Sequence, residues 1–169
     1  MTTWHDERIP TPEECVLRPL LDRRARETPD KVFVQFADSG ATWTYRELRE
    51  QVLETAAALQ ALGVQQEEPV LTWLPNGPEA LRTWFAINYL GAIYIPLNLA
   101  YRGQILEHAV RSSGARLIVG HPDLLPRLDA IDAANMERRV RSKARGRCAS
   151  RVVCRHRPHG RSCRGIRSR

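Results

Sequence analysis

The sequence predicts an α/β protein with a parallel or mixed sheet that carries helices on both faces. Short apolar strands are predicted at residues 69–74, 93–95 and 117–119, each separated from the next by a helical pattern. This alternation is typical of βαβ units, which have right-handed crossovers and parallel neighbouring strands. Strands this short and apolar are expected only where helices cover them.

The other elements follow from local patterns. A hairpin is predicted because an apolar run at residues 31–36 and a second run at 41–45 flank the turn residues Asp38, Ser39 and Gly40. Helices are predicted from Pro19 to about residue 27 and at 45–62, 78–90, 102–113 and, more weakly, 124–136.

The helix at 45–62 has the clearest signals. Thr44 and Glu47 have the spacing of a capping box, in which the hydroxyl accepts the Glu47 amide hydrogen and the carboxylate reaches back to the Thr44 amide. Gly63 suits the left-handed position that ends a helix, and Val64 can then fold back on Leu59.

Charge divides the chain into two parts. Residues 1–136 hold 13 Lys and Arg against 18 Asp and Glu, whereas residues 137–169 hold 13 against 1. The overall charge of +7 therefore describes neither part, and it does not by itself indicate nucleic-acid binding.

Residues 137–169 differ in kind from the rest. They show no apolar periodicity and hold few large aliphatic side chains, so we expect a disordered, Arg-rich tail. Cys148, Cys154, His159 and Cys163 loosely resemble a zinc knuckle, but the first loop is longer than tetrahedral zinc sites use. RNA binding is a further alternative. We favour a third interpretation, a frameshifted or truncated reading frame, because GC-rich codons read out of frame yield this composition.

No signal peptide is predicted, because the first residues are polar and acidic. The longest apolar run, Trp84 to Leu97, is interrupted by Asn88, Gly91 and Pro96 and is too short to span a bilayer. Cys15 is the single cysteine of residues 1–136, which fits a reducing compartment. We therefore expect a cytoplasmic location without a membrane span.

The stretch from Leu20 to Leu128 resembles the start of the adenylate-forming superfamily of acyl-CoA synthetases, peptide-synthetase adenylation domains and luciferases. The resemblance rests on LLDRRARETPDKVFV, TWTYREL, ALGVQQEEPVLTWLPNGPEALRTWFAINYLGAIYIPLN and RSSGARLIV, in that order. Leu90 to Asn98, LGAIYIPLN, looks like the second core motif of the family. The sequences of these motifs are most similar to those of acyl-CoA ligases.

The resemblance implies two half-reactions. ATP and a carboxylic acid give an acyl-adenylate, and CoA then displaces AMP to form a thioester. The family uses a Ser/Thr/Gly-rich phosphate loop, Mg²⁺ and a lysine to stabilise the charge that develops. The lysines here, Lys31 and Lys143, follow no such loop. We therefore assign no catalytic, cofactor-binding or metal-binding residue, and we expect ATP, Mg²⁺ and CoA to be bound by the intact enzyme rather than by this chain alone.

Several individual residues have a structural and a functional interpretation. Asp38–Gly40 and Ser112–Gly114 could hold phosphate but fit a hairpin turn and a helix C-cap better. Four aromatic residues could line an acyl pocket but fit core packing better; they are Trp43, Trp73, Trp84 and Tyr94.

The polar candidates also favour structural roles. Asn76 fits a turn or cap, and His108 and His121 fit surface or loop positions. Glu67 and Glu68 fit a solvated loop.

The sequence thus predicts an N-terminal extension at 1–18, a partial, incomplete N-terminal domain of an acyl-CoA ligase at 19–136, and the basic tail at 137–169. We expect an AMP-forming acid–CoA ligase fragment that is inactive as written. The alternative is a non-catalytic α/β binding module whose tail binds RNA or zinc.

Overall fold

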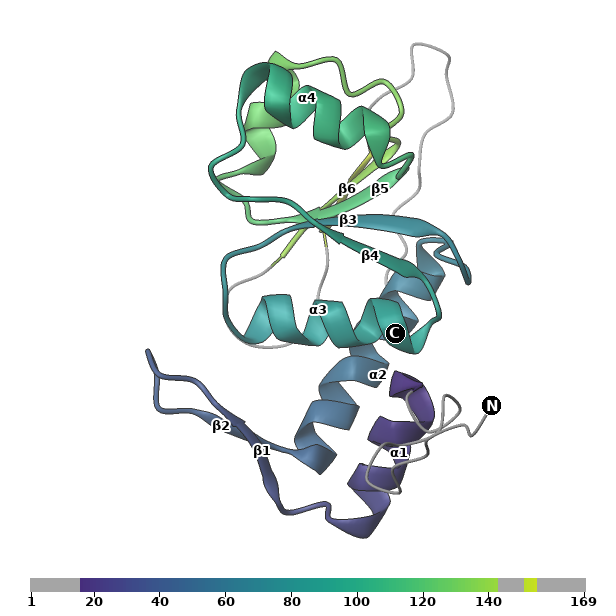
Figure 1. The fold of residues 1–169 in the computed structure, drawn as a ribbon, viewed down its shortest axis with the longest axis vertical. Coiled ribbons are helices and arrows are strands. Elements are labelled where there is room, and N and C mark those ends of the chain that lie inside the picture. Colours follow the sequence, from purple (N-terminus) through teal and green to yellow (C-terminus); the bar gives the residue numbers. More distant parts are fainter. Residues whose placement is uncertain (1–15, 143–150, 155–169) are drawn as a thin grey trace, which may run out of the picture. The chain divides into compact units, whose positions relative to one another are not determined.

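A computed structural model describes residues 16–142 and 151–154 (Figure 1). The chain forms two compact units, one from residues up to 68 together with 76–93, the other from 69–75 together with the residues from 94 onward. Residues 69–75 therefore belong to the second unit, although the residues just before and just after them in the sequence belong to the first.

The described residues of the first unit form three helices and a hairpin. The helices are α1 (Leu17–Glu27), α2 (Tyr45–Ala61) and α3 (Pro78–Tyr89), and α2 packs against both of the others. The hairpin pairs β1 (Val32–Gln35) with β2 (Thr42–Thr44) in antiparallel fashion. The predicted hairpin and the helices beginning at 45 and 78 are confirmed, and α1 begins two residues before Pro19.

Both ends of α2 form as the sequence predicts. The Thr44 hydroxyl accepts the Glu47 amide hydrogen at 3.2 Å, and the Thr44 amide donates to the Glu47 carboxylate at 2.8 Å. Gly63 takes a φ of 84°, which lets the Val64 amide donate to the Leu59 carbonyl at 3.1 Å. The contacts that cap both ends of α2 thus involve only residues close in sequence.

The second unit contains a five-stranded sheet. Its order is β4 (Ile93–Pro96), β3 (Pro69–Trp73), β5 (Leu117–Gly120), β6 (Arg138–Arg141) and β7 (Arg151–Cys154). The pairs β3–β5 and β5–β6 are parallel, and β6–β7 is antiparallel. The sheet is therefore mixed, and the predicted α/β class is confirmed.

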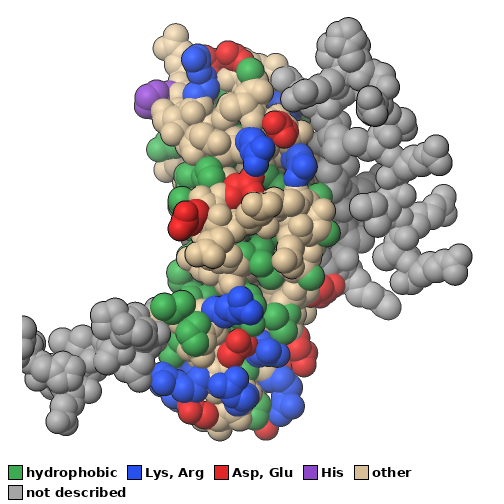
Figure 2. Space-filling model, turned by 90° about the vertical axis from the view of Figure 1, so that its right-hand side faces the viewer, with side chains coloured by type: hydrophobic (Ala, Val, Ile, Leu, Met, Phe, Trp, Pro, Cys, Tyr) green, Lys and Arg blue, Asp and Glu red, His purple; other side chains and the backbone are tan. Residues whose placement is uncertain are grey.

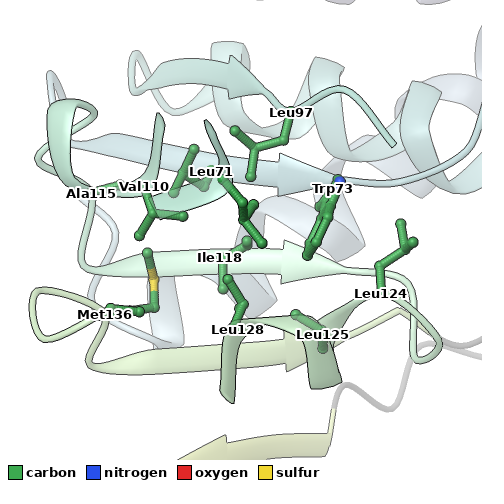
Figure 3. Close-up of a cluster of buried hydrophobic side chains, with 12 residues drawn as sticks. Leu71, Trp73, Leu97, Val110, Ala115, Ile118, Leu124, Leu125, Leu128 and Met136 are labelled. Atoms are coloured by element: carbon green, nitrogen blue, oxygen red, sulfur yellow. The ribbon is translucent and has the colours of Figure 1, made fainter. Parts of the chain in front are cut away.

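The core of this unit lies between the sheet and two helical segments, α4 (Gly103–Ser112) and the 3₁₀ helix η1 (Leu125–Ala130). Figure 3 shows side chains of both meeting those of the strands. Most of the cluster is fully enclosed. Its members are Leu71, Trp73, Leu97, Leu106, Val110, Ala115, Ile118, Leu124, Leu125, Leu128, Ala133 and Met136.

Two expectations need correction. The helix predicted at 124–136 is only the six-residue η1. Regular structure also continues past residue 136, because β6 and β7 lie within the segment expected to be disordered. Val140 of β6 is buried and pairs with Val119 of β5. Pairing with this apolar strand therefore buries a residue that the local composition did not predict to be buried. The proposed domain boundaries themselves remain a prediction.

Within residues 16–142 and 151–154, no helix combines the length and the apolar character needed to cross a bilayer.

Candidate functional site

The segment Asp38–Gly40 forms the hairpin turn. The Gly40 amide donates to the Phe36 carbonyl at 2.8 Å, and the Ala41 amide donates to the Ser39 hydroxyl at 3.3 Å. Two of the amides that a phosphate would need are thus already bonded within the turn. The structural interpretation is confirmed for this segment.

Ser112–Gly114 ends α4. The Ser113 hydroxyl donates to the Val110 carbonyl at 2.7 Å, and Gly114 takes a φ of 63°. A helix C-terminus presents carbonyl oxygens and partial negative charge, whereas phosphate binds to the amides at an N-terminus. This segment is therefore a C-cap, as predicted, and it opposes anion binding.

The aromatic candidates pack mainly against neighbours within their own units. Trp73 is fully buried, and its indole N–H donates to the Asn98 carbonyl at 3.0 Å. Trp43 lies edge-on to Phe36 at 5.0 Å between ring centroids. Core packing is confirmed for Trp73, whereas it is wrong for Trp84, which is 40% exposed.

Tyr94 and the polar candidates are dispersed. Tyr94 is half-buried in β4, and Asn76 lies in an exposed turn without capping α3, whose N-cap is Gly77. His108 lies beside Ser112 on the exposed side of α4, at 3.4 Å from its hydroxyl. The turn role of Asn76 is confirmed, and its alternative role as a cap is not.

His121 and the two loop glutamates also have local roles. The Asp123 amide donates to the His121 ring at 3.3 Å, and the His121 carbonyl accepts the amides that begin η1. The Gln65 amide donates to the Glu68 carboxylate at 3.2 Å, and Glu67 adopts a φ of 62°. The loop interpretation is confirmed for these positions.

The fold itself points to one place where a ligand could bind. In open α/β sheets, ligands bind outside the carboxyl ends of strands where the strand order reverses. Here the chain runs from β3 outward to β4 and then returns to β5 on the other side of β3, so the reversal lies between β3 and β5.

Apolar side chains fill this position. A Cβ atom added to Gly120, at the end of β5, would lie 2.6 Å from a Leu125 methyl group. Leu124 and Leu125 are both buried there (Figure 3). Within the described part of the second unit, the strand reversal is therefore part of the core rather than a ligand site.

The described residues do not fit a metal. Across 16–142 and 151–154, no group of three or more His, Cys, Asp or Glu side chains could hold a cation. These residues therefore do not supply by themselves a ligand set that would hold Mg²⁺. Of the zinc-knuckle candidates, Cys148, His159 and Cys163 lie outside the described residues, and only the backbone of Cys154 is described.

One polar cluster was missed by the sequence analysis. Asp22 of α1 accepts the Arg49 Nε–H of α2 at 2.7 Å and the Tyr89 hydroxyl of α3 at 3.1 Å. Burial by itself raises the pKa of Asp22, but the hydrogen bonds from Arg49 and Tyr89, with the charges of Arg49 and Arg18, outweigh it and lower the pKa. No local signal could reveal this cluster, because its members are 27 and 67 residues apart. The cluster ties three helices together.

Comparison with known proteins assigns the family. The profile of the family described as AMP-binding enzyme matches residues 21–159. The chain belongs to this family. The match runs past Leu128, so the family pattern extends further along the chain than the sequence motifs indicated.

Relatives of two kinds are similar to this chain. Phosphinothricin tripeptide synthetase PhsC of Streptomyces viridochromogenes is 36% identical over 120 residues, which is 71% of this chain and 11% of that protein. Feruloyl-CoA synthase of an Amycolatopsis species is 34% identical over 116 residues, which is 69% of this chain and 23% of that protein. The chain thus spans less than a quarter of the length of either relative.

A solved structure supports the fold. The N-terminal domain of FACL13 from Mycobacterium tuberculosis, crystallised with an inhibitor, has a TM-score of 0.63. The likeness covers 68% of this chain and 29% of that domain, at 22% identity. At this identity the likeness concerns the fold alone, and this chain corresponds to part of that N-terminal domain.

Proposed function

We propose that this chain is the N-terminal part of an enzyme that activates a carboxylic acid with ATP and transfers the acyl group to CoA. In the first half-reaction a carboxylate oxygen attacks the α-phosphorus of ATP, and pyrophosphate leaves. In the second, a thiol sulfur attacks the carbonyl carbon, loses its proton, and AMP leaves. The observation that carries the proposal is the family match over residues 21–159.

The acceptor thiol is the finer part of the proposal. Similarity to feruloyl-CoA synthase favours CoA. Similarity to a tripeptide synthetase favours the alternative, in which the acyl group passes to a thiol on a protein. We retain CoA because the motifs resemble acyl-CoA ligases most closely, and we retain the cytoplasm as the proposed location.

The role of this segment in such an enzyme is structural. Its phosphate-loop candidates are a turn and a C-cap, and its strand reversal is filled by Leu124 and Leu125. We therefore expect the groups that stabilise the charge on phosphorus to lie in parts of the enzyme outside residues 16–142 and 151–154. The residues described here supply two packed units on which those parts can be built.

Exchange of labelled pyrophosphate into ATP tests the proposal. The purified chain is expected to give no exchange above a heat-treated control with fatty, aryl or betaine acids. A chimera in which residues 21–136 replace the matching segment of the feruloyl-CoA synthase is expected to retain exchange with ferulate. A soluble, folded chimera without exchange would contradict the scaffold role, and exchange by the chain alone would contradict its inactivity.

The acceptor is tested on the product of the complete coding sequence. Release of free acyl-CoA supports the proposal, whereas acyl transfer only to a protein-bound thiol supports the peptide-synthetase alternative. Sequencing the DNA around the codons for Leu128 to Arg138 tests the frameshift separately. A one-base shift that restores a Ser/Thr/Gly-rich loop with a lysine would establish it.

A further inference from the structure

Arg139 is a buried cation whose hydrogen-bonding capacity is mostly unused. It lies in β6 between Ile118 of β5 and Val153 of β7, and its side chain is only 10% exposed. Its Nη1 donates to the Asp129 carboxylate at 2.5 Å. Its Nε and Nη2 are closed to solvent and have no hydrogen-bond partner within residues 16–142 and 151–154.

The unpaired atoms form a specific recognition element. The Nε–H and one Nη2–H of a guanidinium point the same way and make the fork that holds two oxygens of a carboxylate or phosphate. Leaving such charged donors buried without acceptors is costly, and Asp129 does not offset the cost for Nε and Nη2 because it bonds only to Nη1. Two hydrogen-bond acceptors, one for Nε and one for Nη2, are therefore missing beside Arg139.

Local charge also favours an anion. Of the four residues of β6, Arg141 lies on the same face as Arg139, Arg138 lies on the opposite face, and none is acidic. This concentration of charge is local, since on the face shown in Figure 2 basic and acidic side chains of the described residues are intermixed.

We propose that the Nε/Nη2 edge of Arg139 binds a small oxyanion, with two of its oxygens accepting one hydrogen bond each. Carboxylate and phosphate share this chemistry, and the experiment separates them. The donors are enclosed, so the ligand is a small ion that enters when the short 3₁₀ helix η1 opens locally. The inference does not depend on the proposed function, because it concerns a site that stabilises the second unit.

Thermal unfolding of the full chain tests the proposal at constant ionic strength. Acetate, inorganic phosphate and chloride are titrated separately against wild type, Arg139→Met and the matched control Arg141→Met, which changes an exposed arginine of the same strand. We expect a saturable rise in midpoint of about 5 °C with acetate or phosphate in wild type and Arg141→Met, but not in Arg139→Met. The larger rise identifies the preferred ion.

The alternatives give different results. A rise in all three proteins would assign binding to exposed arginines and overturn the proposal. An absent rise in wild type would mean that water alone satisfies Arg139, and would overturn it too.

A charge-preserving variant covers the case in which Arg139→Met does not fold. Arg139→Lys keeps the charge but lacks the fork, so it is expected to lose the saturable rise. In ¹⁵N spectra, the Nε–H signal that disappears in Arg139→Lys should shift as the oxyanion is added to wild type. A signal that does not move would contradict the proposed contact.

Discussion

Asp22 and Arg49 form an ion pair at 2.7 Å that joins α1 to α2, and the same carboxylate accepts the hydroxyl of Tyr89 from α3. Arg18 also lies over the Tyr89 ring, at 4.9 Å from its centroid. The helices of the first unit are thus linked by one shared acceptor. Because the Asp22 side chain is 21% exposed, this pair is shielded better than a surface ion pair.

Asp22→Asn is expected to destabilise the chain by about 1 kcal/mol at pH 7, because Arg49 loses its charged acceptor. Urea unfolding monitored by circular dichroism measures the change. Asp30→Asn is the matched control, since Asp30 pairs with Arg46 at 2.9 Å but is 85% exposed. The control should change the free energy of unfolding by less than about 0.5 kcal/mol. Equal losses in the two variants would contradict the role of burial.

The same pair predicts a pH dependence. The pKa of Asp22 is lower in the folded chain than the value of about 3.9 expected when unfolded. Its contribution is therefore fully present above the unfolded pKa and is lost as pH falls through the folded pKa. The difference in unfolding free energy between wild type and Asp22→Asn should be constant from about pH 5 to 7 and should shrink below about pH 4. A difference that grows on acidification would show the opposite shift.

Asp129→Asn is expected to cost about 2 kcal/mol, although Asp129 itself is exposed, because it removes the charged acceptor of a buried guanidinium. Asp123→Asn is the control, since Asp123 is 87% exposed and its carboxylate lies 3.6 Å from the His121 ring. Calorimetry in chloride buffer compares the two. If both variants unfold at the wild-type midpoint, Arg139 is hydrated rather than buried.

Gly120→Ala is expected to cost about 2 kcal/mol, because the new methyl would lie 2.6 Å from a Leu125 methyl group. The cost should be smaller in a Leu125→Ala background, which a double-mutant cycle measures. Gly40→Ala is the control: nothing lies within 4 Å, and its cost arises from a φ of 68°. The cost of Gly40→Ala should be the same with and without Leu125→Ala. If the costs of Gly120→Ala and Leu125→Ala simply add, the proposed contact between these two positions is contradicted.

Chain length provides a further prediction. All residues of β5 are buried, and deleting β6 would expose one edge of that apolar strand. Residues 1–136 expressed alone should therefore aggregate or bind hydrophobic dye, and residues 1–142 should do so less. Light scattering and dye fluorescence compare them with the full chain. A monomeric 1–136 with one sharp unfolding transition would mean that β6 is dispensable.

Local patterns determined the elements whose stability is local. The capping box at Thr44 and Glu47 and the stop at Gly63 defined α2, and the turn at Asp38–Gly40 defined the hairpin. These features require only neighbouring residues, so they could be recognised without knowing the fold.

Tertiary structure alone decided the rest. The charged segment of β6 becomes a strand because it pairs with β5, some twenty residues earlier, and gains burial for Val140 that its own composition does not predict. Long-range packing likewise brings Asp22 to Arg49 and fills the strand reversal with Leu125. The sequence could determine that this chain resembles an adenylate-forming enzyme. Whether its candidate residues form a site depended on contacts between distant segments, which no local pattern encodes.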